Sequence, residues 1–65
     1  MKLIGLTGTN ARIDVTIEEL TTISNALNET CNGIDIPEFE TRVGVPLEQA
    51  HALLAELRAI VDKAR

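Results

Sequence analysis

The chain has 65 residues and a formal net charge of −4, and nearly all of its apolar residues, 45% of the total, are aliphatic. A chain of this length is expected to form one small domain, residues 1–65, that buries only about 60% of the surface exposed by its unfolded form. The single cysteine excludes an internal disulfide, and one Cys with one His is too few for a zinc site built from these residue types. Stability must then come from efficient helix packing or from association with another chain.

Residues 2–16 predict a β-hairpin. Its two strands are separated by turn-forming residues that include one glycine and one asparagine, and both types can adopt the positive φ of a tight turn. After the turn, apolar and charged side chains alternate, as in Arg12, Ile13 and Asp14. This alternation predicts a strand with one apolar face and one charged face.

A first helix is predicted at residues 17–32. Thr16 and Glu19 have the spacing of a capping box, in which each residue accepts a hydrogen bond from the backbone of the other. Gly33 is expected to end the helix in a left-handed conformation. The apolar side chains recur every three or four residues and predict a buried stripe. They are Ile17, Leu20, Ile23, Leu27 and Cys31, with Ala26 at the edge.

Two more helices are predicted at residues 36–43 and 47–64. Asp35 and Glu38 have the spacing of an N-cap and its capping box, and Phe39 is expected to face the core. The longer helix has an apolar stripe over five turns, formed by Ala50, Leu53, Leu54, Leu57, Ile60, Val61 and Ala64. The predicted class is α+β, a hairpin followed by three helices, the last two in a helix-turn-helix-like arrangement.

Residues 36–53 fit the spacing of a DNA-binding helix-turn-helix, since Gly44 stands at its ninth position. A small transcriptional regulator is therefore the alternative function. Glu40 occupies the fifth position, which is normally small and buried, and the would-be recognition helix begins without Arg or Lys. Phosphate contacts need positive charge, so these features argue against nucleic acid as a partner.

No group of residues typical of catalysis is present. His51 has no second residue with which to form a nucleophilic triad, and Cys31 has no positive charge near it in sequence. Residues 28–39 partly match a calcium loop, but Phe39 stands where the bidentate carboxylate is required, and Glu38 comes one residue early. The sequence predicts no enzyme activity, no cofactor and no metal site.

The acidic residues are concentrated in the middle of the chain. Between Asp14 and Glu48 there are eight carboxylates and one basic residue, Arg42. Such a surface repels phosphate backbones and attracts basic patches on proteins. It either binds a basic partner protein or is a solvated face without a partner. The carboxylates expected to contact a partner are Glu18, Glu29, Asp35, Glu38, Glu40 and Glu48.

Three stretches, residues 24–33, 37–45 and 50–57, resemble a pattern in small uncharacterised bacterial proteins, some of them immunity-type partners encoded beside toxins. The resemblance supplies no active-site residues and implies a small acidic binding protein. Together with the acidic segment, it predicts an immunity-type inhibitor that binds a basic protein such as a nuclease-like toxin. Its carboxylates would lie where the toxin's substrate phosphates bind.

A free cysteine without a targeting signal predicts a cytoplasmic protein, and the lack of about 20 consecutive apolar residues predicts no membrane span. The apolar fraction exceeds what one hairpin on three short helices can bury. The apolar stripe of the longest helix also extends past the reach of the short helix before it. We therefore expect a homodimer that contacts through the third helix or the edge of the hairpin.

Overall fold

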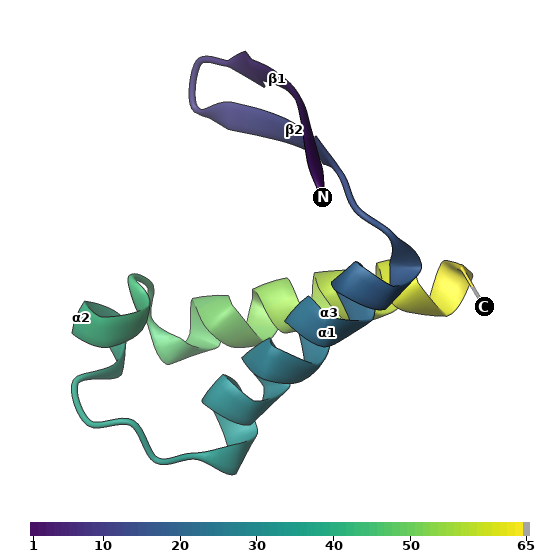
Figure 1. Ribbon diagram of the computed structural model, residues 1–65. Coiled ribbons are helices and arrows are strands. Elements are labelled where there is room, and N and C mark those ends of the chain that lie inside the picture. The colour runs from purple at the N-terminus through teal and green to yellow at the C-terminus, as the bar shows by residue number, and fades with distance from the viewer. Residues whose placement is uncertain (65) are drawn as a thin grey trace.

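The computed structural model describes residues 1–64 as an antiparallel hairpin followed by three helices, which confirms the predicted α+β class (Figure 1). A π-helical turn, Glu29–Gly33, directly follows the first helix. The elements are β1 (Lys2–Thr7), β2 (Asn10–Asp14), α1 (Ile17–Asn28), α2 (Phe39–Val43) and α3 (Leu47–Lys63). Among the helices of residues 1–64, none combines the length and the apolar character needed to cross a bilayer.

The hairpin has one apolar face because of a bulge in β1. Leu3 lies opposite Ile13 and Leu6 lies opposite Ala11, and the register shifts at Ile4, between these pairs. Residues directly opposite each other share a face, so these four side chains lie on the same side of the sheet. Leu3 and Leu6 are three residues apart, and without the bulge they would point to opposite sides. The other face carries Lys2, Arg12 and Asp14.

The start of α1 is fixed by the predicted capping box. The backbone N–H of Glu19 donates to Oγ1 of Thr16 at 3.0 Å, and Oε1 of Glu19 accepts from the Thr16 backbone N–H at 2.9 Å. The second carboxylate oxygen of Glu19, Oε2, accepts a hydrogen bond from the Met1 ammonium at 2.7 Å. One side chain therefore both caps α1 and joins it to the beginning of β1.

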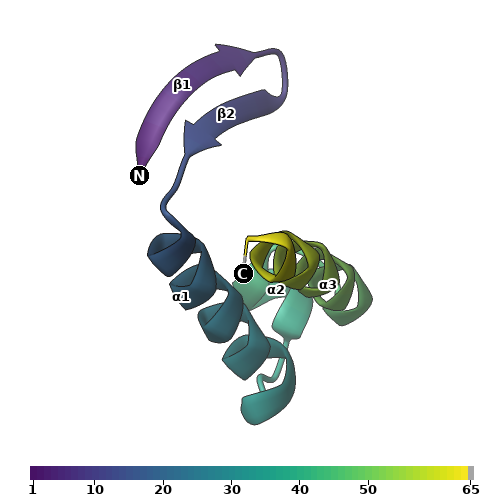
Figure 2. The same cartoon turned by 90° about the vertical axis from the view of Figure 1, so that its right-hand side faces the viewer.

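Helices α1 and α3 lie side by side and form a helical layer, whose core is small (Figure 2). The predicted stripe of α3 is divided: Leu54 and Val61 are buried, whereas Leu53 and Ile60 are exposed. On α1 the division is similar, because Leu20 is buried while Ile17 and Ile23 are exposed. Among residues 1–64, the buried apolar side chains are Leu20, Ala50, Leu54 and Val61.

Helix α2 begins three residues later than predicted. Pro37 disfavours a helical conformation of the residue before it, so Ile36 cannot be helical and the helix starts at Phe39. Glu38 has a left-handed backbone, φ 55°, and makes no side-chain cap hydrogen bond, so the predicted capping box with Asp35 is wrong. Phe39 is half-buried rather than part of the core.

The end of α1 also differs from the prediction. Gly33 has no positive φ; within residues 1–64 the left-handed positions are Gly8, Glu38 and Gly44. The chain leaves α1 through the π-helical turn, after which Ile34 is extended. A glycine next to the end of a helical pattern therefore did not mark a left-handed cap here.

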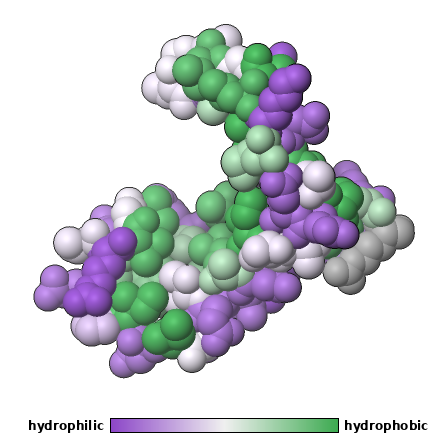
Figure 3. Space-filling model, in the orientation of Figure 1, coloured by the Kyte–Doolittle hydropathy of each residue, from purple (hydrophilic) through white to green (hydrophobic). Residues whose placement is uncertain are grey.

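The hairpin stands away from the helical layer as an arm, and the space-filling view shows an open notch between the two (Figures 1 and 3). The radius of gyration is 13.1 Å. A compact domain of this length would have a radius of gyration of about 11 Å. The chain is thus more extended than its length requires, because the arm stands away from the helices of residues 1–64.

Candidate protein-binding surface

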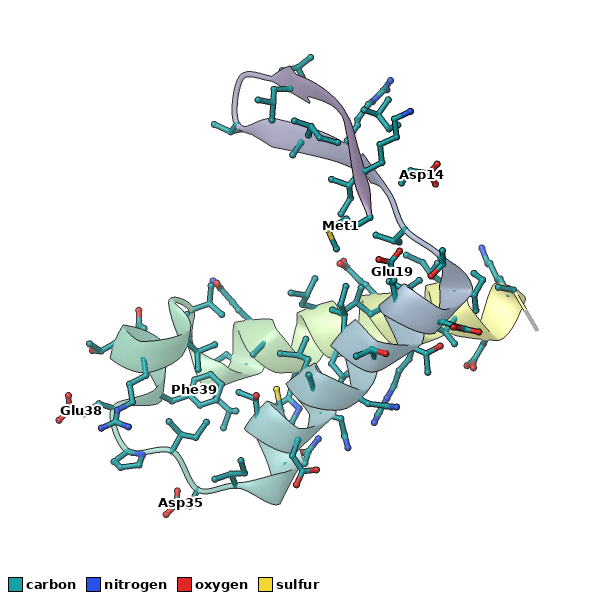
Figure 4. The ribbon with its side chains drawn as sticks, in the orientation of Figure 1. Met1, Asp14, Glu19, Asp35, Glu38 and Phe39 are labelled. Atoms are coloured by element: carbon teal, nitrogen blue, oxygen red, sulfur yellow. The ribbon has the colours of Figure 1, made fainter. Side chains whose placement is uncertain are left out.

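Four of the six predicted partner-binding carboxylates lie at one end of the helical layer. Asp35 and Glu38 belong to the segment that enters α2, Glu40 lies within α2, and Glu48 lies in the first turn of α3. Figure 4 shows Asp35 and Glu38 at this end, pointing outward. We call these four residues the acidic end. All four are exposed.

The other two predicted residues are separated from one another. Glu29 begins the π-helical turn that leads into the segment of Asp35. Glu18 lies in the first turn of α1, at the opposite end of the layer from α2 (Figure 1). A carboxylate in a first turn favours the positive pole of the helix dipole, which gives Glu18 a structural reason to be acidic. The six residues therefore do not form one continuous surface.

The carboxylates of the acidic end have no partner among residues 1–64. The ion pair found among these residues joins Met1 to Glu19, far from α2. Arg42, in the last turn of α2, is not paired with Glu38 or Glu40. Because the predicted capping box is absent, helix capping does not account for Asp35 and Glu38. Their side chains are available for an external partner.

Glu38 also carries backbone strain. A left-handed conformation costs a residue with a Cβ about 1 kcal/mol, which a glycine would not incur. Such positions are concentrated at functional sites, where the surrounding structure maintains them. The strained residue is thus also one of the exposed carboxylates of the acidic end.

A second feature was missed at the sequence level. Ser24 is 5% exposed, and its hydroxyl oxygen has no hydrogen-bond partner within residues 1–64. It lines a shallow hollow of about 190 Å³ between α1 and α3, next to Arg58, whose Nη2 donates to Oδ1 of Asn28 at 2.7 Å. The signal was present in the sequence, since Ser24 follows Leu20 by four residues and so shares its helix face.

The residues that could act in catalysis or bind a metal do not form a cluster within residues 1–64. His51 is exposed, Cys31 is half-buried, and no three His, Cys, Asp or Glu side chains of residues 1–64 come together as metal ligands would. In the helix-turn-helix reading, the start of α3 presents Glu48, Gln49 and His51 to solvent. Comparison of the chain with models of protein families, with curated proteins and with solved structures finds no match.

Proposed function

We propose that this protein is a binding module whose acidic end docks onto a basic patch of another protein. The observation that carries the proposal is the group of exposed carboxylates at α2 that pair with no described residue of their own chain. Carboxylates that form no ion pair within residues 1–64 are free to form one with an approaching cation. Their field also accelerates the encounter with a basic surface.

An immunity-type inhibitor of a nuclease-like toxin is the form of this function that we favour. A nuclease has a basic cleft that binds the phosphates of its substrate. A row of carboxylates is negatively charged, as those phosphates are, and can bind to the same cleft. Asp35, Glu38 and Glu40 would occupy that cleft and exclude the substrate. The free thiol of Cys31 supports a reducing compartment, so we place the protein in the cytoplasm.

The test is recovery of a partner from the native host, followed by charge reversal. The double variant Glu38→Lys with Glu40→Lys should weaken binding by at least about a hundredfold at low salt, because two attractive contacts become repulsive. The loss should shrink as added salt screens the charges. Binding would be followed by titration calorimetry over a series of salt concentrations.

The matched control changes the same amount of charge elsewhere. The double variant Glu18→Lys with Asp62→Lys alters the net charge equally, and both residues lie at the end of the layer away from α2. It should bind within a few-fold of the wild type. Equal losses in both double variants would show a response to net charge alone and contradict an acidic binding site. Unchanged binding of the Glu38/Glu40 variant would contradict it as well.

A further inference from the structure

The arm presents a complete apolar face to solvent. Leu3, Leu6 and Ile13 are 56%, 70% and 51% exposed, so the helices of their own chain do not cover them. A two-stranded hairpin is only marginally stable in water unless its apolar face packs against another layer. The arm therefore lacks the layer that such a hairpin requires.

The helical layer has a matching apolar flank. Thr21, Asn25, Arg58 and Asp62 line the hollow on one side of the α1–α3 contact. At 100° per residue, the exposed side chains of Ile23, Leu53 and Ile60 lie on the opposite side of that contact. We call these three residues the flank.

The arm rises from the side of the layer that carries the flank. Glu19, which binds the Met1 ammonium, precedes Ile23 by one turn of α1 and so shares its face. The notch in Figure 3 is therefore bounded by the layer below and the arm above, with hydrophobic surface on both. Each of these two apolar surfaces needs an apolar surface of another molecule to cover it.

We propose that this other molecule is a second copy of this chain, and that two copies clasp reciprocally, with the arm of each lying on the flank of the other. Each chain supplies one arm and one flank, so a two-fold axis satisfies all four surfaces at once. The proposal concerns the chain alone and does not depend on the acidic end, whose carboxylates lie outside both surfaces.

The exposed area has the size that such a dimer needs. The chain exposes 5146 Å². A compact monomer of this mass would expose about 4,100 Å², which leaves an excess of about 1,000 Å² per chain. Stable interfaces bury about 800 Å² per partner. Covering the arm and the flank would therefore account for the excess.

The charges favour arm against helical layer over the other pairings. Residues 1–15 carry Lys2, Arg12 and Asp14, a formal charge of +1, whereas residues 16–65 carry nine acidic and four basic residues, a charge of −5. Two layers placed face to face would repel, and so would two arms. An arm on the partner's layer joins opposite signs.

The experiment begins with light scattering of the purified chain over a dilution series. The wild type should have the mass of two chains at the upper concentrations and dissociate on dilution. Leu6→Asp in the arm and Ile60→Asp in the flank should each weaken the dimer about a hundredfold or more, because each change disrupts two symmetric contacts. Thr7→Asp, on the polar face of the arm, and Thr22→Asp, on the exposed side of α1, add the same charge and should leave the dimer within a few-fold of wild type.

Cross-linking identifies which surfaces meet, and it uses changes mild enough to preserve folding. In a Cys31→Ser background, Leu6→Cys with Ile60→Cys is treated with a short bifunctional maleimide. The clasp predicts a covalent species of two chains. A cross-link within one chain would show that the arm folds onto its own flank and would overturn the proposal. So would efficient cross-linking of Leu6→Cys alone, which indicates arm against arm, or a wild type that has the mass of one chain throughout.

Discussion

Leu53 and Leu54 are consecutive residues of α3, yet 48% of the first is exposed and only 2% of the second. The boundary between the core and the flank therefore passes between two identical side chains. Leu54 belongs to the buried core of the helical layer, whereas Leu53 lies on the surface that we assign to the dimer. Substitutions of these two residues can therefore distinguish burial in the core of one chain from burial in the proposed dimer interface.

We predict that Leu54→Ala lowers the free energy of unfolding by about 2–5 kcal/mol at every protein concentration, because it leaves a cavity in a core of four residues. Leu53→Ala should cost about 0.5 kcal/mol in dilute solution, with a loss that grows as the dimer forms. Denaturant unfolding at several protein concentrations provides the comparison. Losses of equal size and equal concentration dependence would contradict the division of the stripe.

The junction between the arm and α1 should respond to pH. The hydrogen bond from the Met1 ammonium, followed by that from the Thr16 backbone, lowers the pKa of Glu19 below its ordinary value. A lowered carboxyl pKa stabilises the fold above the unfolded pKa, and the stabilisation is lost as the pH falls through the folded value. Glu19→Gln should therefore lower the melting temperature at neutral pH and cost progressively less below about pH 4.

Glu18→Gln is the control for this effect. It removes the same charge from the same helical turn but breaks no ion pair. Melting temperatures of both variants would be measured by circular dichroism between acidic and neutral pH. If the Glu19 variant lost as much stability in acid as at neutral pH, its carboxylate would not be the stabilising group.

Ser24→Ala should stabilise the protein by about 1 kcal/mol. The buried hydroxyl has no partner within residues 1–64, and an unsatisfied buried hydroxyl costs free energy that an alanine methyl does not. Alanine is also the better helix former. Thr22→Ala, at an exposed position whose hydroxyl bonds to the Glu18 carbonyl, is the comparison. A loss of stability in Ser24→Ala would show that the hydroxyl has a partner in solution.

The backbone strain at Glu38 can be removed by a substitution that leaves the residues of α2 unchanged. Glu38→Gly should raise the free energy of unfolding by about 1 kcal/mol, since glycine adopts the left-handed conformation freely. Gly44→Ala should lower it by about 1–2 kcal/mol, because its φ of 100° disfavours any side chain.

Glu38→Gln separates strain from charge in the same assay. This variant keeps the side chain and its strained backbone but removes the carboxylate. It should leave stability unchanged while weakening binding to a basic partner. Stabilisation by glutamine as large as that by glycine would identify charge repulsion, rather than backbone strain, as the cost at this position.

The local signals of the sequence predicted the fold well. The capping box of Thr16 and Glu19 depends on a three-residue spacing, and the structure contains both of its hydrogen bonds. The predicted start of α2 is wrong. The spacing between Asp35 and Glu38 is typical of a helix cap, but Pro37 disfavours a helical conformation at Ile36. Local signals compete, and here the steric one prevails over the hydrogen-bonding one.

The tertiary features were less accessible from the sequence. A helical stripe as wide as that of α3 does not reveal which edge meets α1, so the exposure of Leu53 and Ile60 could not be predicted. The carboxylates of α2 and the start of α3 lie at one end of the layer because a short turn joins the two helices. Glu18 was grouped with them only because charge was counted along the chain, and the arrangement of α1 separates it.

The bulge at Ile4 also determines how the hairpin responds to a change in length. Deleting this one residue would remove the bulge and leave Leu3 and Leu6 two residues apart, so both would stay on the face that they share with Ile13 and Ala11. Regular alternation at the present length would instead turn Leu3 to the side that carries Lys2 and Arg12. The deletion of Ile4 should therefore be tolerated about as well as a substitution at the same site. In an alignment of related chains, we would expect the spacing from Leu3 to the turn to differ by one residue between chains with and without the bulge.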